Sequence, residues 1–331
     1  MTRSSAKGSP AGRSAYLVLG MHRSGTSAAT QLLALCGAEL PANVMPGDEH
    51  NAKGYFEPWK IAQFNSARLR AGVSAWDDVF VFPYVALEEK AEAAWRRDAV
   101  ELFQSEYGRA RHPLLKDPRV TVLLPMWRAA LKSLSVEMRC VIPVRHPLAV
   151  AGSLARRDGF PVEKSVLLWC AYMLAAEAYT RDLPRVFVAY DALLADWRRE
   201  VARIEAAHGA ALPGLNDRSA REIDRFLTAD LRHNAAAADL AATPKVGAMA
   251  AQVLDWLESA ARDEPADPAA LEAAAAQIAR MKEEMGVFVS PAARDLDQAR
   301  HDLLELRQFE AHQQAHLQKA EAIVDRLLNG G

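Results

Sequence analysis

The sequence has few cysteines and no long apolar run. Its three cysteines, Cys36, Cys140 and Cys170, are too few and too scattered for a disulfide framework or a structural zinc site. Each lies in an apolar stretch, as a small core residue would, and the pattern fits a reducing cytosol. No segment approaches the ~18 consecutive apolar residues of a membrane span, and the start of the chain lacks the apolar centre of a signal peptide. These absences predict a cytoplasmic protein without a membrane span.

The chain also lacks an excess of charge of either sign. A formal net charge of −2 over 331 residues gives no global attraction for nucleic acid or anionic membranes. Glycine and proline, at 17 each, are too rare for collagen-like or low-complexity chains, and half of the residues are apolar, which excludes a disordered protein. Any polyanionic ligand must therefore be held by a local cluster of basic residues. Residues 1–14 are polar, and we expect a disordered tail there.

Four short apolar segments are typical of buried parallel strands. They span residues 16–20, 114–115, 140–144 and 185–190. Helical patterns lie between them, among them residues 58–71, 87–108 and an amphipathic stretch over 162–180. After the last strand, Asp191 is expected to cap a helix whose apolar stripe runs from Leu194 to Ile204.

This alternation predicts an α/β fold with three layers and a central parallel sheet. Ligands of such sheets bind at the carboxyl ends of the strands. The polar turns that follow the strands are therefore expected on one rim.

After about residue 210 the chain is Ala-rich and helical, and we expect these helices to extend an α/β domain over residues 15–290. Asp267 and Pro268 are a good start for a helix through Met281. Residues 291–331 are predicted to form a separate long helix. It has an approximate heptad of apolar residues, broken by Glu310 and Gln313. Packing on its own domain and a coiled coil joining two copies both explain this repeat, which comprises Leu296, Leu303, Leu306, Leu317, Val324 and Leu327.

The most informative motif follows the first predicted strand and opens a helix. It reads Gly20-Met21-His22-Arg23-Ser24-Gly25-Thr26-Ser27. Backbone N–H groups, a helix N-terminus and hydroxyls together form a cradle for a phosphate-like anion. A Walker A loop has lysine after its second glycine. Here Thr26 takes that place and the cation is Arg23, so ordinary ATP chemistry is disfavoured. The alternative to an anion-binding loop is a glycine-containing turn that binds no ligand.

A second motif follows the third predicted strand. Arg145 lies at the carboxyl end of that strand, and Ser153 lies about two turns into the next helix. A guanidinium fork and a hydroxyl together suit a phosphate monoester. The pair alone is weak evidence, because a surface arginine and a helical serine are common.

Together the two motifs resemble those of a known protein family. GMHRSGTS resembles the 5′-phosphosulfate loop of sulfotransferases, and RHPLAVAGS resembles their 3′-phosphate motif. GYFEP (54–58), LLKDPR (114–119) and RDGFP (157–161) look like a bacterial branch of that family, and the resemblance covers about residues 15–235. It implies a P-loop-like fold, the donor 3′-phosphoadenosine-5′-phosphosulfate (PAPS) and no metal. Residues 22–27 would then hold the 5′-phosphosulfate, and Arg145 with Ser153 the 3′-phosphate.

The resemblance also implies roles in catalysis. Lys116, with Arg23, would neutralise the leaving phosphate, because the lysine of the similar motif in some sulfotransferases contacts the reacting sulfate. Glu57 is the best match for the base, and its aromatic neighbours would desolvate it. The other reading of Glu57 is a residue that initiates a helix, and that of Lys116 is a solvated surface charge. Glu49, His50 and His22 compete as the base, and His233 is a further candidate to face the acceptor.

The sequence therefore predicts a sulfotransferase that transfers a sulfuryl group from PAPS to a hydroxyl, with a glycan or other carbohydrate-containing molecule as the expected acceptor. The long loop over residues 41–58 and aromatic residues would suit sugar faces; these are Tyr55, Phe56, Trp59 and Trp76. Two alternatives stand beside it. One is a P-loop kinase or nucleotide hydrolase, and the other is a non-catalytic nucleotide-binding scaffold that uses the C-terminal helix.

Overall fold

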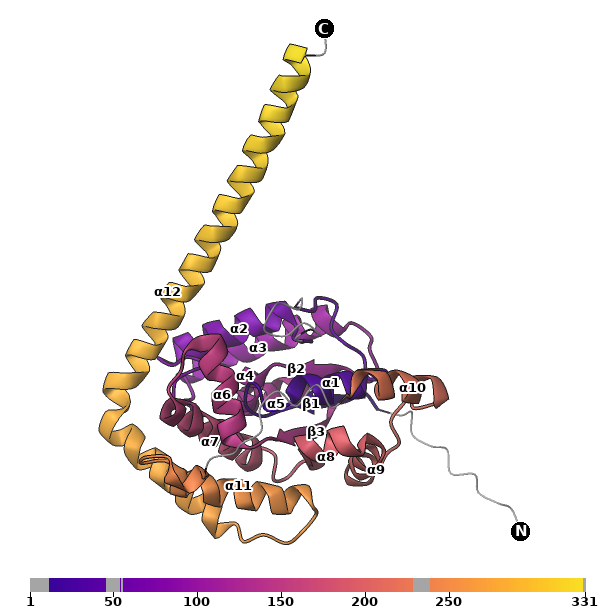
Figure 1. The fold of residues 1–331 in the computed structure, drawn as a ribbon, viewed down its shortest axis with the longest axis vertical. Coiled ribbons are helices and arrows are strands. Elements are labelled where there is room, and N and C mark those ends of the chain that lie inside the picture. Colours follow the sequence, from indigo (N-terminus) through magenta and orange to yellow (C-terminus); the bar gives the residue numbers. More distant parts are fainter. Residues whose placement is uncertain (1–11, 46–53, 55, 229–238, 330–331) are drawn as a thin grey trace, which may run out of the picture.

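A parallel sheet forms the centre of the molecule, and a single long helix projects from the body (Figure 1). The structure is a computed structural model that describes residues 12–45, 54, 56–228 and 239–329. The strands are β1 (Ser14–Val18), β2 (Leu114–Lys116), β3 (Glu137–Val144) and β4 (Arg185–Ala189), in the order β2-β1-β3-β4. Every neighbouring pair is parallel, with Val18 opposite Lys116 and Val141. The carboxyl ends of the strands therefore lie at one edge, and the α/β fold class is confirmed.

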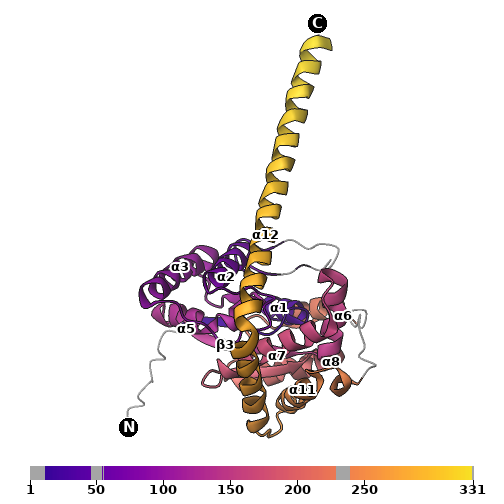
Figure 2. The same ribbon diagram turned by 90° about the vertical axis from the view of Figure 1, so that its left-hand side faces the viewer.

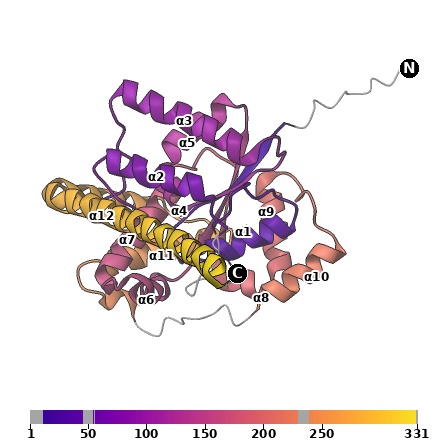
Figure 3. The same ribbon diagram turned by 90° about the horizontal axis from the view of Figure 1, so that it is seen from above.

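Alternation along the strands produces the three layers. Ala15 and Leu17 of β1 belong to one apolar core, whereas Tyr16 and Val18 belong to the other. The first core is covered mainly by α3 (Glu89–Tyr107), α5 (Leu124–Ser133), α7 (Val162–Ala178) and α11 (Gly247–Ala261). The second is covered by α1 (Thr26–Leu35), α9 (Trp197–His208) and α10 (Asp217–Phe226). Figure 3 shows α3 and α5 on one side of the sheet and α1, α9 and α10 on the other.

The remaining elements are helices at the ends of the strands and in the C-terminal part of the chain. They are α2 (Trp59–Ala71), α4 (Pro118–Val122), α6 (Pro147–Asp158), α8 (Tyr190–Ala195), the 3-10 helix Leu240–Ala242 and α12 (Ala269–Asn329). The first strand begins at Ser14, two residues earlier than the sequence indicated. Of the predicted tail, residues 1–11 lie outside the described residues.

Two helical predictions need correction. The helix over 162–180 was expected to be amphipathic, but α7 is buried from Ser165 to Glu177 because α4, α6, α11 and α12 surround it. Asp191 does not cap a single helix, because α8 already begins at Tyr190. Asp196 caps the next helix by accepting a hydrogen bond from the Arg199 N–H at 3.1 Å. The predicted apolar stripe is thus divided between α8 and α9.

The C-terminal helix is one continuous element of 61 residues. The sequence indicated two helices with a boundary at Pro291, yet Pro291 lies inside α12. Its lower part packs on α11, α2 and α7, and buries Leu271, Ala274 and Ile278. Figure 2 shows the upper part extending away from the body.

The cysteines are core residues, as the sequence indicated. All three are free and buried. Burial raises the pKa of the Cys36 and Cys140 thiols to about 12, so neither is a reactive thiolate near neutral pH. In the part of the chain that the structure describes, no helix is both long and apolar enough to cross a bilayer.

Candidate active site

The loop between β1 and α1 turns sharply at three residues. Gly20, Arg23 and Gly25 have φ values of 127°, 67° and 92°, and Gly25 is the N-cap of α1. The Gly20 N–H donates to Thr121 Oγ1 at 2.8 Å, which fixes the loop to α4. Turns of this kind aim successive N–H groups inward, and a helix N-terminus adds partial positive charge. The loop therefore has the local geometry of an anion cradle.

Gly25 is required at its position for two reasons. Its φ of 92° lies in the region that favours glycine, and a Cβ there would collide with Cδ2 of the Tyr190 ring. Tyr190 is the residue that follows β4, and sequence reasoning did not single it out. Its place at the carboxyl end of a strand was the signal that could have found it.

The structure brings the two sequence motifs together. Arg23 Nε donates to Ser153 Oγ at 2.8 Å, and Arg145 NH1 donates to the Arg23 carbonyl at 3.0 Å. The Arg145 guanidinium also lies over the Tyr190 ring, 4.7 Å from its centroid. Burial lowers the pKa of Arg145 from its ordinary value. Two cations and a buried hydroxyl from segments more than 120 residues apart thus meet beside the loop.

A cavity of about 710 Å³ opens beside Arg145. It lies past the ends of β3 and β4, whose last residues Val144 and Ala189 contribute to its wall. Its polar lining has three arginines, three carboxylates, a histidine and a tyrosine: Arg145, Arg199, Arg262, Asp191, Glu200, Glu258, His146 and Tyr190. This volume is in the range of pockets that hold small organic ligands and cofactors.

Two polar atoms of the loop are buried without a hydrogen-bond partner among the described residues. They are Ser24 Oγ and His22 Nε2. Buried polar groups are almost always hydrogen-bonded, so such atoms are expected where a ligand completes the site. The remaining loop hydroxyls lie at the start of α1, with Thr26 buried and Ser27 half-buried.

The His22 ring faces an aromatic wall. Its centroid lies 4.8 Å from that of Trp76 and 6.0 Å from that of Tyr172. Burial, assisted by the positive charges of Arg119 and Arg157, lowers the pKa of His22 well below its ordinary value. The imidazole is therefore neutral at physiological pH.

Lys116 and Glu57 form a buried ion pair. Lys116 is the last residue of β2, and its Nζ lies 2.6 Å from Glu57 Oε1. Arg119 NH1 lies 3.9 Å from Glu57 Oε2 and 2.8 Å from Asp117 Oδ1. Sequence reasoning overlooked Arg119, although it ends the LLKDPR motif. Glu57 thus faces two cations, and its environment is more polar than the aromatic setting expected from its neighbours in sequence.

The segment around Glu57 is held by backbone pairing. The Met45 N–H donates to the Glu57 carbonyl at 2.7 Å, and the Trp59 N–H donates to the Asn43 carbonyl at 3.0 Å. Asn43 in turn donates from Nδ2 to Glu106 Oε1 of α3 at 2.9 Å. The stem of the loop over residues 41–58 therefore positions Glu57.

Several candidates lie outside the described residues. They are Glu49, His50, the aromatic Tyr55 and His233.

The turn after β2 is fixed by a buried chain of hydrogen bonds. Asn65 Nδ2 donates to Asp117 Oδ2 at 2.7 Å, and Trp127 Nε1 donates to Asn65 Oδ1 at 2.9 Å. Asp117 also accepts the Arg119 N–H as the cap of α4. A satisfied buried network restricts the conformations open to its members, so the backbone that carries Lys116 is well anchored.

No group of three or more histidine, cysteine, aspartate or glutamate side chains in the described ranges could hold a metal ion. The site combines cations around an anion cradle with carboxylates that include Glu57 and Asp117.

Comparison with known structures finds distant neighbours, among them two sulfotransferase domains. The sulfotransferase domain from the Synechococcus PCC 7002 olefin synthase is 16% identical, with a TM-score of 0.42, over 76% of this chain and 98% of its own. The sulfotransferase domain from the curacin biosynthetic pathway is 12% identical, with a TM-score of 0.37, over 62% of this chain and 79% of its own. No protein-family model and no curated protein matches the chain. Both neighbours are sulfotransferase domains, but at this distance any activity has to be argued from the site's own residues.

Proposed function

We propose that this protein is a sulfotransferase that uses PAPS as its donor. The observation that carries the proposal is the meeting of the loop over residues 20–27 with Arg145 and Ser153, through the contacts of Arg23. PAPS has an anionic group at each side of its ribose, a 5′-phosphosulfate and a 3′-phosphate. A cradle of loop N–H groups suits the first anion, and a guanidinium with a neighbouring hydroxyl suits the second.

The surroundings support this donor. Ser24 Oγ is a buried hydroxyl in the cradle that a phosphosulfate oxygen could partner. The cavity beside Arg145 and Tyr190 offers room for the rest of the nucleotide. In the proposed arrangement His22, Arg23, Ser24, Gly25, Thr26 and Ser27 hold the 5′ side, and Arg145 with Ser153 holds the 3′ side.

Sulfuryl transfer should follow the logic of in-line phosphoryl transfer. The acceptor oxygen forms a bond to sulfur while the bond from sulfur to the 5′-phosphate oxygen breaks. The acceptor proton passes to the Glu57 carboxylate, and the phosphate leaves with the negative charge that Lys116 and Arg23 stabilise. Because Lys116 Nζ and Glu57 Oε1 lie 2.6 Å apart, one small region of the site contains both the base and a cation.

A carbohydrate hydroxyl is the acceptor that we propose. Trp76 and Phe160 stack with centroids 5.8 Å apart and an interplanar angle of 27°. His22 lies against Trp76, which connects this aromatic wall to the loop. Arg157 and Lys164 lie over the Trp76 and Phe160 rings, 5.3 and 3.9 Å from their centroids. A mixture of aromatic and polar side chains suits the two-sided character of a sugar ring.

The donor assignment is tested by thermal-shift titration with 3′-phosphoadenosine 5′-phosphate, ADP and ATP. A ligand that binds only the native state raises its stability, by about 2.7 kcal/mol at a hundredfold excess over Kd. We expect a shift with the bisphosphate that ADP and ATP do not match. An equal response to ADP would overturn the donor assignment, and magnesium-dependent ATP turnover would favour a kinase or hydrolase.

A matched pair of arginines sharpens this test. Arg145→Ala should remove the preference for the 3′-phosphate. Arg139→Ala changes an arginine near the start of β3, the strand that Arg145 directly follows; Arg139 pairs there with Glu137, and its loss should leave the preference intact. Equal behaviour of the two variants would speak against Arg145 as the 3′-phosphate ligand.

The base is tested separately. Glu57→Gln should lower turnover of PAPS by about 10²-fold or more, the usual contribution of a general base. Binding of 3′-phosphoadenosine 5′-phosphate serves as the control and should change little. Near-wild-type turnover with bound PAPS would show that Glu57 is not the general base. Binding without transfer to any acceptor would favour a non-catalytic scaffold.

A further inference from the structure

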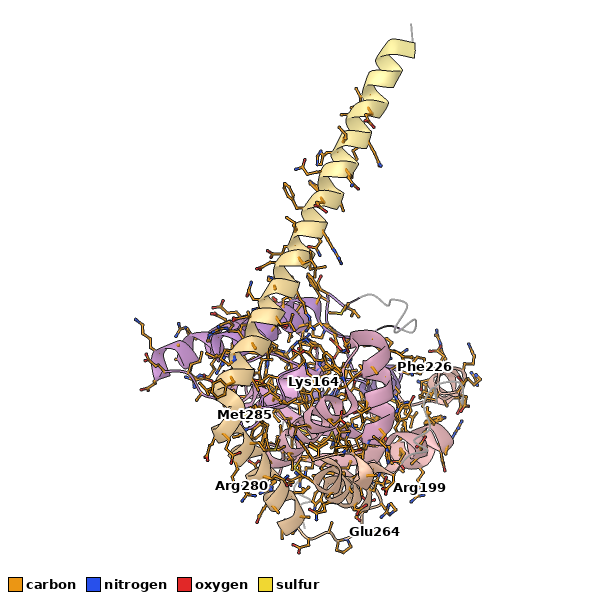
Figure 4. The ribbon with its side chains drawn as sticks, turned by 60° about the vertical axis from the view of Figure 1, so that its left-hand side comes forward. Lys164, Arg199, Phe226, Glu264, Arg280 and Met285 are labelled. Carbon is orange, nitrogen blue, oxygen red and sulfur yellow. The ribbon has the colours of Figure 1, made fainter. Side chains whose placement is uncertain are left out.

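The upper part of α12 leaves the body after two ion pairs. Asp297 Oδ2 lies 2.6 Å from Arg70 NH1 of α2, and Arg300 NH1 lies 3.3 Å from Asp77 Oδ2. Beyond them every described side chain from Asp302 to Glu321 is exposed. Figure 4 shows these side chains pointing outward around the ribbon, above the labelled Met285. A helix of this kind has no tertiary packing to stabilise it, which most protein helices need.

An apolar stripe runs along this exposed part. Leu296, Leu303, Leu306 and Leu317 are 47%, 47%, 56% and 61% exposed. Leu296, Leu303 and Leu317 lie on one seven-residue row with Glu310, and Leu306 lies on the adjacent row with Ala299, Gln313 and Ala320. Two such rows are the a and d positions of a coiled coil, so the stripe is a seam of the width that a second helix covers.

We propose that a second copy of this chain covers the seam, in a parallel and in-register coiled coil over residues 295–321. In that arrangement each g residue faces the e residue five positions further along the other copy. The facing pairs are Asp295 with Arg300, Asp302 with Arg307, Phe309 with Gln314 and His316 with Glu321. The two Asp–Arg pairs have opposite charges, and no pair brings like charges together.

The charge pattern selects this orientation and this partner. In an antiparallel pair the g row faces itself and the e row faces itself, so Asp302 would lose its arginine.

A membrane surface is a poor match, because a helix that lies on anionic lipid has a wide apolar face and a basic polar face. Here acidic side chains outnumber basic ones between residues 295 and 321, although exposed Leu304 and Phe309 widen the apolar face beyond the two rows. The acidic residues are Asp295, Asp297, Asp302, Glu305, Glu310 and Glu321, and the basic ones are Arg300, Arg307 and Lys319.

Glu310 and Gln313 weaken the seam at its centre. Glu310 occupies an a position, where it would face Glu310 of the second copy, and like charges at a core position oppose association. Because these two polar residues oppose association, Glu310→Leu with Gln313→Leu should tighten the dimer at least tenfold. Leu303→Glu with Leu306→Glu should make the chain monomeric.

The experiment is sedimentation equilibrium of the full chain and these two variants. We expect a dimer mass that falls on dilution, a tighter dimer for the leucine variant and a monomer for the glutamate variant. A monomer for both the wild type and the leucine variant at all concentrations would overturn the proposal. So would a dimer that survives in the glutamate variant. The measured mass does not depend on PAPS, so this result is independent of the proposed enzymatic activity.

Two further variants test orientation and register. Asp302→Arg alone should weaken the dimer, and adding Arg307→Asp should restore it, because the facing charges are then exchanged. Leu303→Cys should form an intermolecular disulfide on mild oxidation, whereas Gln308→Cys on the outer face should not; the native cysteines are buried and contribute little background. Failure of the double charge variant to recover, or equal cross-linking by both cysteines, would rule out the parallel in-register pair.

Discussion

Gly25 is the residue where backbone and packing demands coincide. Its φ of 92° disfavours any side chain, and Tyr190 occupies the place of a Cβ. Gly25→Ala should therefore cost more stability than the conformational penalty of about 1 kcal/mol. Overpacking against the ring should add about 1–3 kcal/mol. Urea unfolding measures this loss, and binding of 3′-phosphoadenosine 5′-phosphate should fall with it.

Gly159 is the matched control for Gly25. It has a φ of 70°, and no heavy atom lies within 4 Å of the place that a Cβ would take. Gly159→Ala should show the conformational penalty alone and leave ligand binding unchanged. Equal losses of stability in the two variants would mean that Tyr190 moves aside freely.

The Lys116–Glu57 pair makes a second prediction at the residue scale. Both side chains are buried, so Lys116→Met leaves the Glu57 carboxylate without its nearest cation. Removing one partner of a buried ion pair typically costs about 3–5 kcal/mol. Only Arg119, at 3.9 Å, then faces the carboxylate. Adding Glu57→Gln removes this poorly compensated charge, so the double variant should unfold at a higher urea concentration than Lys116→Met. A double variant that is less stable than Lys116→Met would contradict this account.

Residues with a local signal could be predicted from the sequence, and the others could not. The loop over residues 20–27 and the Arg145–Ser153 spacing lie within short segments whose pattern can be read directly. Arg119 and Tyr190 owe their importance to contacts with Glu57 and Gly25, which lie far away in the sequence. Only the fold brings such residues together.

At the scale of elements, α12 shows how packing overrides local signals. Proline inside a helix removes one backbone hydrogen bond, which made Pro291 a natural boundary in the sequence. The helix nevertheless continues through it, with packing on the body below this point and an ion pair to α2 just above it. The burial of α7 on all sides has the same origin, because sequence periodicity cannot show how many neighbours a helix has.

The ion pair between α2 and α12 yields a prediction at this scale. Asp297 is largely buried and lies 2.6 Å from Arg70, whereas Asp295 is exposed and pairs with its neighbour Arg294. Asp297→Asn should destabilise the protein by about 1–3 kcal/mol and speed amide exchange in α12 around residues 290–300. Asp295→Asn, measured at a concentration where the chain is monomeric, should stay within about 0.5 kcal/mol of the wild type. Similar exchange rates in the two variants would show that this ion pair does not hold α12 on the body.

The whole fold was predictable to the level of the sheet. Short apolar strands separated by helices determine a parallel sheet, and a parallel sheet places all the strand ends at one edge. That reasoning anticipated that the turns after β1, β2 and β3 would share a rim, as the register of the strands requires. The position of α12 was not predictable, because a heptad does not reveal whether its partner belongs to the same chain.

The histidines give the whole molecule a dependence on pH. Burial lowers the pKa of His22, most strongly, and also of His112, His146 and His208. In the unfolded chain these residues bind protons near their ordinary pKa of 6.5, whereas in the native state they bind them only at a lower pH. The unfolded state therefore gains protons as the pH falls below that value, and stability decreases.

We therefore expect the urea midpoint to fall between pH 7.5 and pH 5.5. Each buried histidine contributes about 1.4 kcal/mol for every unit by which its pKa is lowered, once the pH is below its pKa in both states. His22→Asn removes the most strongly shifted group and should flatten the dependence, and His208→Asn should flatten it less. A midpoint that stays constant or rises on acidification would show that the native state binds these protons, and it would contradict a buried, neutral His22 in the loop over residues 20–27.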